Sequence, residues 1–245
     1  VIVDPTIKER TWLEESLFQV LLRKEVPTVV LDYQGRATRC ICDMYRWRYP
    51  SLKDLSIIGS KKIKILDSIL NSEILPADLL QRFSKTISGV PPLFIDMDYA
   101  KFGENKAVEE QNQHEASFIK VFIDHILSDK VTIKPGSISI LTPYKNQRRY
   151  LDDVFSDYSY NSNATKSEEA ERLDIATTDE YQGLQNDIVL VSLVSTSVRP
   201  SPHLSNPKRL NVLTSRSRAM FVLIGNKKTF EKSNEWKQVL STFEF

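Results

Sequence analysis

The residues best suited to phosphate chemistry are three arginines near the end of the chain. Arg209, Arg216 and Arg218 all lie in the segment 206–218. If that segment is helical, Arg209 and Arg216, which are seven residues apart, share one face, and Arg218 lies almost opposite Arg216. A guanidinium held on a rigid element can bind phosphate through two parallel hydrogen bonds. A solvated basic helix is the alternative for this segment taken alone.

A short helix followed by a buried strand would hold these arginines in place. Asn206 is a favourable N-cap, and Pro207 suits the first helical position because its missing N–H has no partner there anyway. The apolar run 219–224 predicts a buried strand that ends at Gly225. The arginines are therefore expected where a helix feeds into a core strand.

A second cluster of cations opens a helix after another apolar run. Thr142 follows the run 138–141, and the first turns of the predicted helix carry Lys145, Arg148 and Arg149. Cations near a helix N-terminus oppose the helix dipole. The placement is favourable if an anion such as a nucleic-acid phosphate occupies the helix start, and the alternative is that these side chains extend into water.

A third polar group ends the predicted strand 173–177. The hydroxyl and backbone N–H groups of Thr177 and Thr178 could bind phosphates, and Gly183 permits a close turn shortly afterwards. Ligands of open parallel sheets gather at the carboxyl ends of the strands. We therefore expect all of these motifs to meet at that one edge.

Strands that alternate with helices predict an α/β fold with a parallel sheet. The runs are almost continuously apolar, which is typical of strands covered on both faces. The predicted strands are 28–31, 92–97, 138–141, 173–177, 188–194 and 221–224. Helices are predicted for 12–23, for a segment that ends near Trp47, and for a segment that Asn112 and Glu115 would open as a capping box.

The chain divides into three predicted parts. Residues 1–26 form a connecting helix, 27–230 form the main domain, and 231–245 form a C-terminal tail. Within the main domain we expect a helical insertion at 59–91 and an exposed loop at 156–171, which is rich in Ser, Asn and acidic residues.

Composition excludes several classes of protein. The 245 residues carry a net charge of +1, with two cysteines and three histidines. Cys40 and Cys42 have no Cys or His cluster to join, so neither a metal site nor a disulfide framework is expected, and a reducing intracellular setting fits. Apolar runs fall well short of the ~20 residues that span a bilayer, so a membrane partner is not expected.

Three segments, taken in order, resemble motifs IV, V and VI of superfamily 1 helicases, in the branch of the nonsense-mediated-decay helicase and senataxin. They are 138–147, 173–187 and 206–218, and the resemblance covers most of the chain from Pro92 to Asn226. It implies a three-layer, parallel-sheet RecA-like domain of the P-loop NTPase class, here the second lobe of a helicase.

The resemblance also implies roles for individual residues at a nucleotide. Arg216 matches the motif VI arginine that reaches the γ-phosphate, while Gln34 and Arg36 match a Gln-Tyr-Arg-Met motif in which Gly35 replaces the aromatic residue. Arg36 and Arg216 would act as arginine fingers, and Gln34 would contact the nucleotide. A surface salt bridge is the alternative for Arg36.

Further positions follow from the same comparison of motifs. Gly183 and Gln185 would approach the nucleotide, although Gln185 stands where relatives commonly have Glu, and Ser195 replaces an Arg that many relatives carry after the strand. The expected nucleic-acid contacts are Thr142, Tyr144, Lys145, Thr177, Thr178 and Arg209.

The sequence lacks a Gly-x-x-x-x-Gly-Lys-Ser/Thr phosphate loop and an Asp-Glu pair in the strand context that holds Mg²⁺. ATP and Mg²⁺ would therefore be bound mainly by a preceding RecA-like domain, and we expect this chain, which starts at Val1, to be a piece of a larger ATP-dependent RNA helicase. This fragment alone would not hydrolyse ATP.

The segment 34–52 narrows the resemblance to the spliceosomal member of the branch. That likeness implies an RNA substrate, spliceosomal partners, a role in pre-mRNA splicing and a nuclear location. Two alternatives stay open: a decay or RNA-silencing helicase, and a diverged RNA-binding scaffold that no longer hydrolyses ATP. A nucleotide-dependent enzyme of another sort, such as a methyltransferase, would require a Gly-rich turn, and the seven glycines are not clustered.

Overall fold

The computed structural model describes residues 15–60, 90–97, 110–127, 133–159, 172–195 and 200–243. The expected helical insertion at 59–91 lies almost entirely outside these residues, apart from the end of α4 (Ser56–Ser60) and the residues at 90–91. Of the loop expected at 156–171, the described start is helical, as α9 (Ser156–Ser159). The chain forms two compact units, Val1–Tyr33 and Gln34–Phe245.

The first unit contains α2 (Leu17–Arg23), which begins with a capping box. Ser16 Oγ accepts from Gln19 N at 3.2 Å, and Gln19 Oε1 accepts from Ser16 N at 3.0 Å. The buried strand predicted at 28–31 is wrong, because Val29, Val30 and Leu31 are 89%, 78% and 86% exposed. These residues have irregular backbone and form no strand, and a lone extended segment buries nothing.

The second unit is built around a five-stranded sheet in the order β3-β7-β6-β4-β5, with every neighbouring pair parallel. The strands are β3 (Leu93–Asp96), β4 (Ile138–Thr142), β5 (Asp174–Thr177), β6 (Asn186–Ser192) and β7 (Ser217–Gly225). The parallel α/β sheet predicted from the sequence is confirmed. A separate two-stranded sheet joins β1 (Tyr33–Gln34) and β2 (Lys53–Asp54).

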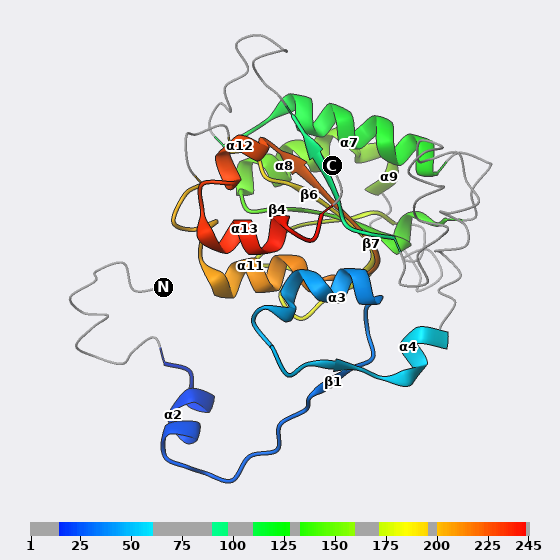
Figure 1. Cartoon of the computed structure of the whole chain (residues 1–245). Coiled ribbons are helices and arrows are strands. Elements are labelled where there is room, and N and C mark those ends of the chain that lie inside the picture. Colours follow the sequence, from blue (N-terminus) through cyan, green and yellow to red (C-terminus); the bar gives the residue numbers. More distant parts are fainter. Residues whose placement is uncertain are drawn as a thin grey trace. The chain divides into compact units, whose positions relative to one another are not determined.

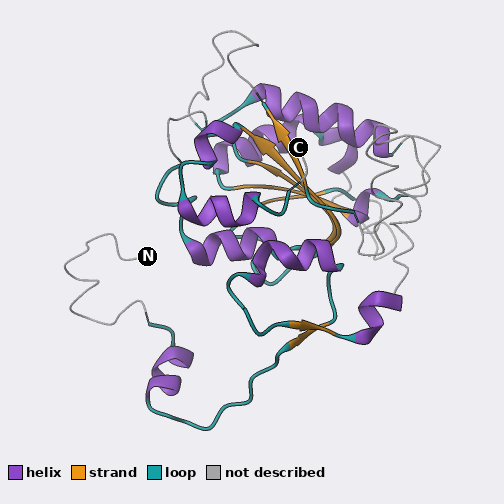
Figure 2. Cartoon of the chain, viewed as in Figure 1, coloured by secondary structure: helices purple, strands orange, loops and turns teal. Residues whose placement is uncertain are grey.

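Helices cover both faces of the main sheet (Figures 1 and 2). One face packs against α7 (Gln113–Ile126) and α8 (Lys145–Val154). The other packs against α3 (Arg39–Arg46), α11 (Pro207–Thr214), α12 (Lys227–Phe230) and α13 (Asn234–Leu240). A short 3₁₀ turn, η1 (Pro135–Ser137), leads into β4. The three-layer arrangement is that of a RecA-like domain.

The central strand β6 explains the continuous apolar runs. Ile188 and Leu190 belong to the core on the α7 and α8 side, whereas Val189 and Val191 belong to the core on the α3 and α11 side. All four side chains are fully buried. Since successive side chains of a strand point to opposite faces, a strand covered on both faces must be apolar at every position.

The helix predicted to carry the arginines is shorter than expected. α11 begins as predicted at its N-cap Asn206, but β7 already starts at Ser217, which is in register with Asn186 of β6. The prediction that Arg209 and Arg216 share one helical face is therefore wrong. Arg216 lies in the turn between helix and strand, because the backbone of this turn already bonds to the sheet through Asn186 N and Arg216 O at 3.0 Å.

The segment expected as a C-terminal tail contains α13, whose Trp236 is fully buried. The ring centroid of Trp236 lies 4.6 Å from that of Phe230, and its Nε1 donates to Leu204 O at 3.0 Å. This helix therefore contributes to the core, and it also fixes the loop that precedes α11.

Replacing Trp236 by alanine is expected to lower the free energy of unfolding by about 3–5 kcal/mol, because a large cavity opens and the Leu204 carbonyl loses its donor. Urea denaturation followed by fluorescence or circular dichroism measures the change. Val121→Ala on α7, at a residue 70% exposed, is the matched control and should stay within about 0.5 kcal/mol of the parent chain. Equal losses in both variants would contradict this role of α13.

Candidate functional site

The predicted site residues fall at two opposite edges of the sheet. Thr142 and Thr177 end β4 and β5, so they lie at the carboxyl edge. Gly183 and Gln185 precede β6, and Arg216 precedes β7, so these three lie at the amino edge. The expectation that every motif meets at the carboxyl edge is therefore wrong. All strands of a parallel sheet run in the same direction, so residues that precede a strand lie at the amino edge and residues that follow a strand lie at the carboxyl edge.

The segment 178–185 connects these two edges by crossing one face of the sheet in a series of turns. It starts at the carboxyl edge, where Thr178 N donates to Thr142 O at 3.0 Å. The buried Tyr181 hydroxyl then lies 2.8 Å from Ser139 Oγ on β4. Ser139 Oγ also accepts from Asn186 Nδ2 at 2.9 Å, at the amino edge.

Gly183 is the one position in this crossing whose backbone requires glycine. Its φ is +92°, a conformation that side-chain-bearing residues rarely adopt. A Cβ added to Gly183 would meet no atom within 4 Å. Glycine is therefore required here by the backbone conformation and not by lack of space.

Two arginines converge on the turn that precedes β7. Arg36 Nη1 donates to Ser215 O at 3.3 Å, and Arg216 Nη2 donates to Ser215 Oγ at 2.8 Å. Arg216 is held further by Nε to Val212 O at 2.8 Å and by Nη1 to Leu184 O at 3.0 Å. These acceptors are carbonyl and hydroxyl groups, so the bonds orient the guanidiniums without neutralising them.

The pKa of the Arg216 guanidinium is lowered, first by burial and then by the positive charge of Arg36. The positive charge of Arg36 therefore destabilises the charged form of Arg216. An anion placed between them would relieve that repulsion, and the planar donors of arginine suit phosphate oxygens.

Gln34 fixes the backbone that carries Arg36. Its Oε1 accepts from Arg36 N at 2.9 Å and Ala37 N at 3.1 Å. Its Nε2 donates to Ala37 O at 3.0 Å and to Asp54 Oδ1 at 2.7 Å. Arg46 of α3 binds the same Asp54 carboxylate through Nη2, at 3.0 Å to each oxygen. The donors and acceptors of the Gln34 amide are therefore all engaged in holding the backbone at Arg36 and Ala37 and the Asp54 carboxylate, and its predicted contact with a nucleotide stays a prediction.

A leucine side chain lies beside the glycine that replaces the aromatic residue of the motif. A Cβ added to Gly35 would lie 2.9 Å from Leu55 Cδ1. Leu55 is 44% exposed and can move, so the space beside Gly35 is filled by a side chain from another part of the chain and is not closed by backbone.

At the carboxyl edge, Thr177 and Glu180 hold the start of the crossing segment. Thr177 N donates to Glu180 Oε2 at 2.9 Å, and Glu180 N donates to Thr177 Oγ1 at 3.3 Å. Hydrogen bonds from the Thr177 backbone and hydroxyl lower the pKa of Glu180. Thr178 Oγ1 reaches Thr142 O at 3.4 Å, and Thr142 itself is fully buried.

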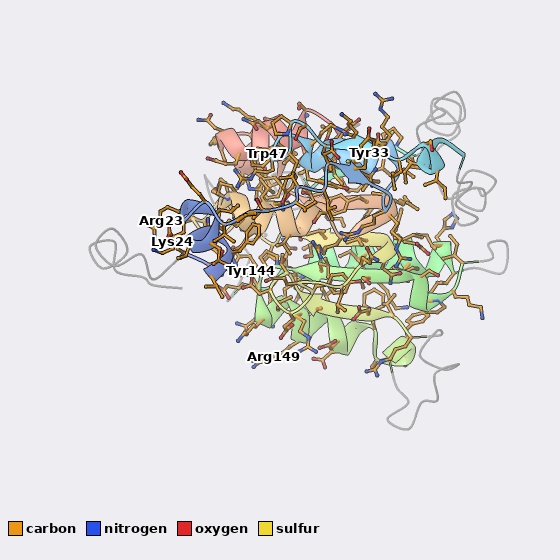
Figure 3. All side chains as sticks on the ribbon, turned by 90° about the horizontal axis from the view of Figure 1, so that it is seen from below. Arg23, Lys24, Tyr33, Trp47, Tyr144 and Arg149 are labelled. Carbon is orange, nitrogen blue, oxygen red and sulfur yellow. The ribbon has the colours of Figure 1, made fainter. Side chains whose placement is uncertain are left out.

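The accessible predicted contacts at this edge belong to α8 and α11. Lys145 is exposed in the first turn of α8, and the N-cap Tyr144 leaves that helix without a side-chain cap. Arg209 Nη2 binds Asp179 Oδ2 at 3.3 Å, and Arg209 and Thr178 line one small hollow. Tyr144 is half-buried, and Figure 3 shows Arg149 on the outer side of α8.

Sequence reasoning missed a polar cavity at the amino edge. Its volume is about 880 Å³, and its lining includes Gln185, Tyr181 and Arg218. Arg218 Nη1 binds Asp187 Oδ1 at 3.1 Å across the ends of β7 and β6. The sequence signal that pointed to this site was Tyr181, which lies in a polar turn between two strands, because a buried tyrosine hydroxyl needs a hydrogen-bond partner.

The described residues contain no group of three or more His, Cys, Asp or Glu side chains that could hold a metal ion. Burial raises the pKa of Cys40 to about 11, so its thiol stays protonated at neutral pH. None of the helices in the described part of the chain has the length and apolar composition needed to cross a bilayer.

A comparison with protein families matches residues 13–228 to an AAA domain family. The chain belongs to this family, which is one of superfamily 1 helicases. The relationship to the spliceosomal helicase expected from 34–52 is confirmed: RNA helicase aquarius of Mus musculus is 28% identical over 243 residues, which are 96% of this chain and 14% of the mouse protein.

Two further relatives come from distant organisms. The regulator of nonsense transcripts 1 homolog of Neurospora crassa is 25% identical over 95% of this chain and 20% of its own length. An uncharacterized ATP-dependent helicase of Methanocaldococcus jannaschii is 23% identical over 96% of this chain and 32% of its own length. The chain thus spans a third or less of each of these relatives.

Replacing Glu180 by glutamine is expected to destabilise the crossing segment at neutral pH, and the difference should vanish in acid. The folded-state pKa of Glu180 is lowered, so its bonds stabilise the fold above the unfolded pKa of about 4.3 and are lost as pH falls through the folded value. Urea unfolding of both chains between pH 7 and pH 3 measures the difference. If the two chains still differ in stability at pH 3, the ionised Glu180 carboxylate is not what stabilises the crossing segment.

Proposed function

We propose that this chain is the second RecA-like half of an ATP-dependent RNA helicase. The observation that carries the proposal is the pair of guanidiniums, Arg36 and Arg216, held together on Ser215 at the amino edge of the sheet. They act as arginine fingers on the γ-phosphate of an ATP bound mainly by a preceding RecA-like domain of the same protein. Membership in a superfamily 1 helicase family and likeness to ATP-dependent relatives support this.

The arginine pair suits phosphoryl transfer because negative charge is spread over the oxygens of the transferred group. Donors already in place before the reaction need no reorganisation as that charge develops. Gly183 and Gln185 approach the nucleotide from the same edge, where the Gln185 amide can hydrogen-bond a ribose hydroxyl. Mg²⁺ is held by the preceding domain, since the described residues here offer guanidiniums and no carboxylate cluster.

RNA is proposed to bind at the opposite, carboxyl edge. Lys145, Tyr144 and Arg209 contact its backbone from the starts of α8 and α11. Thr142 and Thr177 contribute through the hydrogen bonds that hold Thr178 and the following turn. Opening and closing of the ATP cleft then changes the RNA affinity of the two lobes, and this alternation drives translocation.

The lobe is proposed to extend from about residue 34 to 243, because the residues before it form a separate unit and α13 packs into the core. The preceding segment, which contains α2, would connect it to the first lobe. We also propose a nuclear role in pre-mRNA splicing with spliceosomal partners, supported by the likeness to Aquarius. A role in RNA decay is the alternative within the family.

The second candidate function is a scaffold that binds RNA without hydrolysing ATP. It is favoured by the departures from the helicase motifs at Gly35, Gln185 and Ser195. An intact phosphate loop in the preceding domain would count against it.

Arg216→Ala and Arg36→Ala in the full-length protein are each expected to lower ATP turnover by about 10³-fold or more, because each removes a donor to the transferring phosphoryl group. RNA affinity should change by less than about twofold, since RNA binds at the other edge. Steady-state ATP hydrolysis and fluorescence anisotropy with single-stranded RNA measure the two effects.

Arg149→Ala, which removes an exposed guanidinium from the outer side of α8, is the matched control and should retain parental turnover. Normal turnover in Arg216→Ala would overturn the proposed role of the pair. Lack of turnover in the parent protein itself, with RNA binding retained, would favour the scaffold.

Lys145→Ala is expected to weaken RNA binding and to reduce the slope of log Kd against log salt by about 0.7, the value for one phosphate contact on a single strand. Anisotropy titrations over a range of salt concentrations measure the slope. Lys237→Ala on α13, also at an exposed lysine, should leave it unchanged. If Lys145→Ala and Lys237→Ala give the same slope of log Kd against log salt, RNA does not contact Lys145 at the start of α8.

A further inference from the structure

Arg36 is exposed, so the place of its guanidinium depends on the backbone that carries it. After Arg36, that backbone is tied to the start of β7, because Thr38 N donates to Arg218 O at 2.9 Å. Before Arg36, it is tied to the residue that follows β2, because Leu55 N donates to Gln34 O at 2.9 Å. The turn between these two ties is held by the Gln34 side chain.

The Gln34 amide can hold this turn in one orientation only. Its oxygen must face the backbone N–H groups of Arg36 and Ala37, at 2.9 and 3.1 Å, which leaves its Nε2 to face acceptors. A flipped amide would set donors against those N–H groups and release both of them. The acceptors around Nε2 therefore decide whether the turn is held.

Asp54 is the acceptor that orients the amide from outside the turn. Gln34 Nε2 donates to Asp54 Oδ1 at 2.7 Å and to Ala37 O at 3.0 Å. A hydrogen bond to an ionised carboxylate is stronger than one to a neutral carbonyl. Ala37 belongs to the turn itself, whereas Asp54 lies 20 residues from Gln34 along the chain and gives the amide a fixed reference.

Arg46 of α3 holds the Asp54 carboxylate in turn. Its Nη2 lies 3.0 Å from each of the two carboxylate oxygens. The same guanidinium donates from Nε to Asp43 Oδ1 at 2.8 Å and from Nη1 to Leu52 O. The Asp54 side chain is only 22% exposed and faces a cation that is fixed at three nitrogens, so its direction toward Gln34 is well defined.

We propose that Asp54 is a positioning residue for ATP hydrolysis, which acts by orienting the Gln34 amide and thereby the backbone of Arg36. The inference rests on the proposed function, because it assumes that Arg36 is an arginine finger. Neither Asp54 nor Arg46 has to approach the nucleotide. The role follows from the precision that a finger requires, since a displacement of about 1 Å at a reacting group can lower a rate about a hundredfold.

The test uses the full-length protein, with kcat and KM measured by steady-state ATP hydrolysis and the Kd for single-stranded RNA by anisotropy. Asp54→Ala is expected to lower kcat by about tenfold or more, because the Gln34 amide loses the acceptor that fixes its orientation. The KM for ATP and the RNA Kd should each stay within about twofold, since ATP is bound mainly by the preceding lobe and RNA at the other edge.

Asp43→Ala is the matched control. It removes the other carboxylate that binds Arg46 and leaves the bond from Gln34 to Asp54 in place. Because Asp43 is 43% exposed, its ion pair contributes little, and kcat should stay within about twofold of the parent value. Asp54→Asn keeps an acceptor oxygen for Gln34 but not the charge, so it is expected to recover most of the kcat that Asp54→Ala loses.

A double variant separates positioning from general damage to the fold. If Asp54 acts through Arg36, adding Asp54→Ala to Arg36→Ala lowers kcat by less than about twofold further, because the group being positioned is already gone. A purely structural role would give the same loss in both backgrounds and would raise the RNA Kd as well.

An unchanged kcat in Asp54→Ala, an equal loss in Asp43→Ala or Asp54→Asn, or a full additional loss in the double variant would overturn the inference. Failure of the proposed function gives a different result, because Arg36→Ala would then keep parental turnover by itself.

Discussion

The carbonyl and hydroxyl oxygens of Ser215 bring two guanidinium groups to one point, although the groups repel each other. The fold supports this unfavourable contact through elements distant in sequence. Gln34 fixes the backbone before α3, and the register of β6 with β7 fixes the turn that carries Arg216. In the part of the chain that the structure describes, the hydrogen bonds of Arg36 and Arg216 go to carbonyl and hydroxyl oxygens, so under the proposed function their positive charge is available to an anion from outside the lobe.

Much of the fold follows from local patterns in the sequence. The central strands are apolar at consecutive positions because both of their faces are covered, and Asn206 and Asn112 cap their helices as their side chains predict. The run at 28–31 has the same pattern but is exposed. Apolar composition reports that a segment suits burial, whereas burial also requires a neighbouring strand, and the local pattern carries no information about that neighbour.

The site was less predictable than the fold because two of its determinants are non-local. The sequence places Thr177 and Gly183 close together, yet they lie toward opposite edges, since the chain crosses the sheet between them through turns instead of a helix. Likewise, Glu115 matches a capping motif, but its carboxylate is used 79 residues away at Val194. Only the packed structure shows which of several possible partners a polar side chain takes.

The hydrogen bond between the Tyr181 and Ser139 hydroxyls fastens the middle of the crossing segment to β4, and Asn186, at the start of β6, donates to the same Ser139 hydroxyl. A segment secured in this way cannot slacken while the sheet stays still, because close-packed interiors deform little. Under the proposed function, work done by a nucleotide at the amino ends of the strands would therefore reach the carboxyl ends as a rotation of the sheet and its helices as one block. The lobe would then act as a stiff lever whose hinges lie outside the sheet.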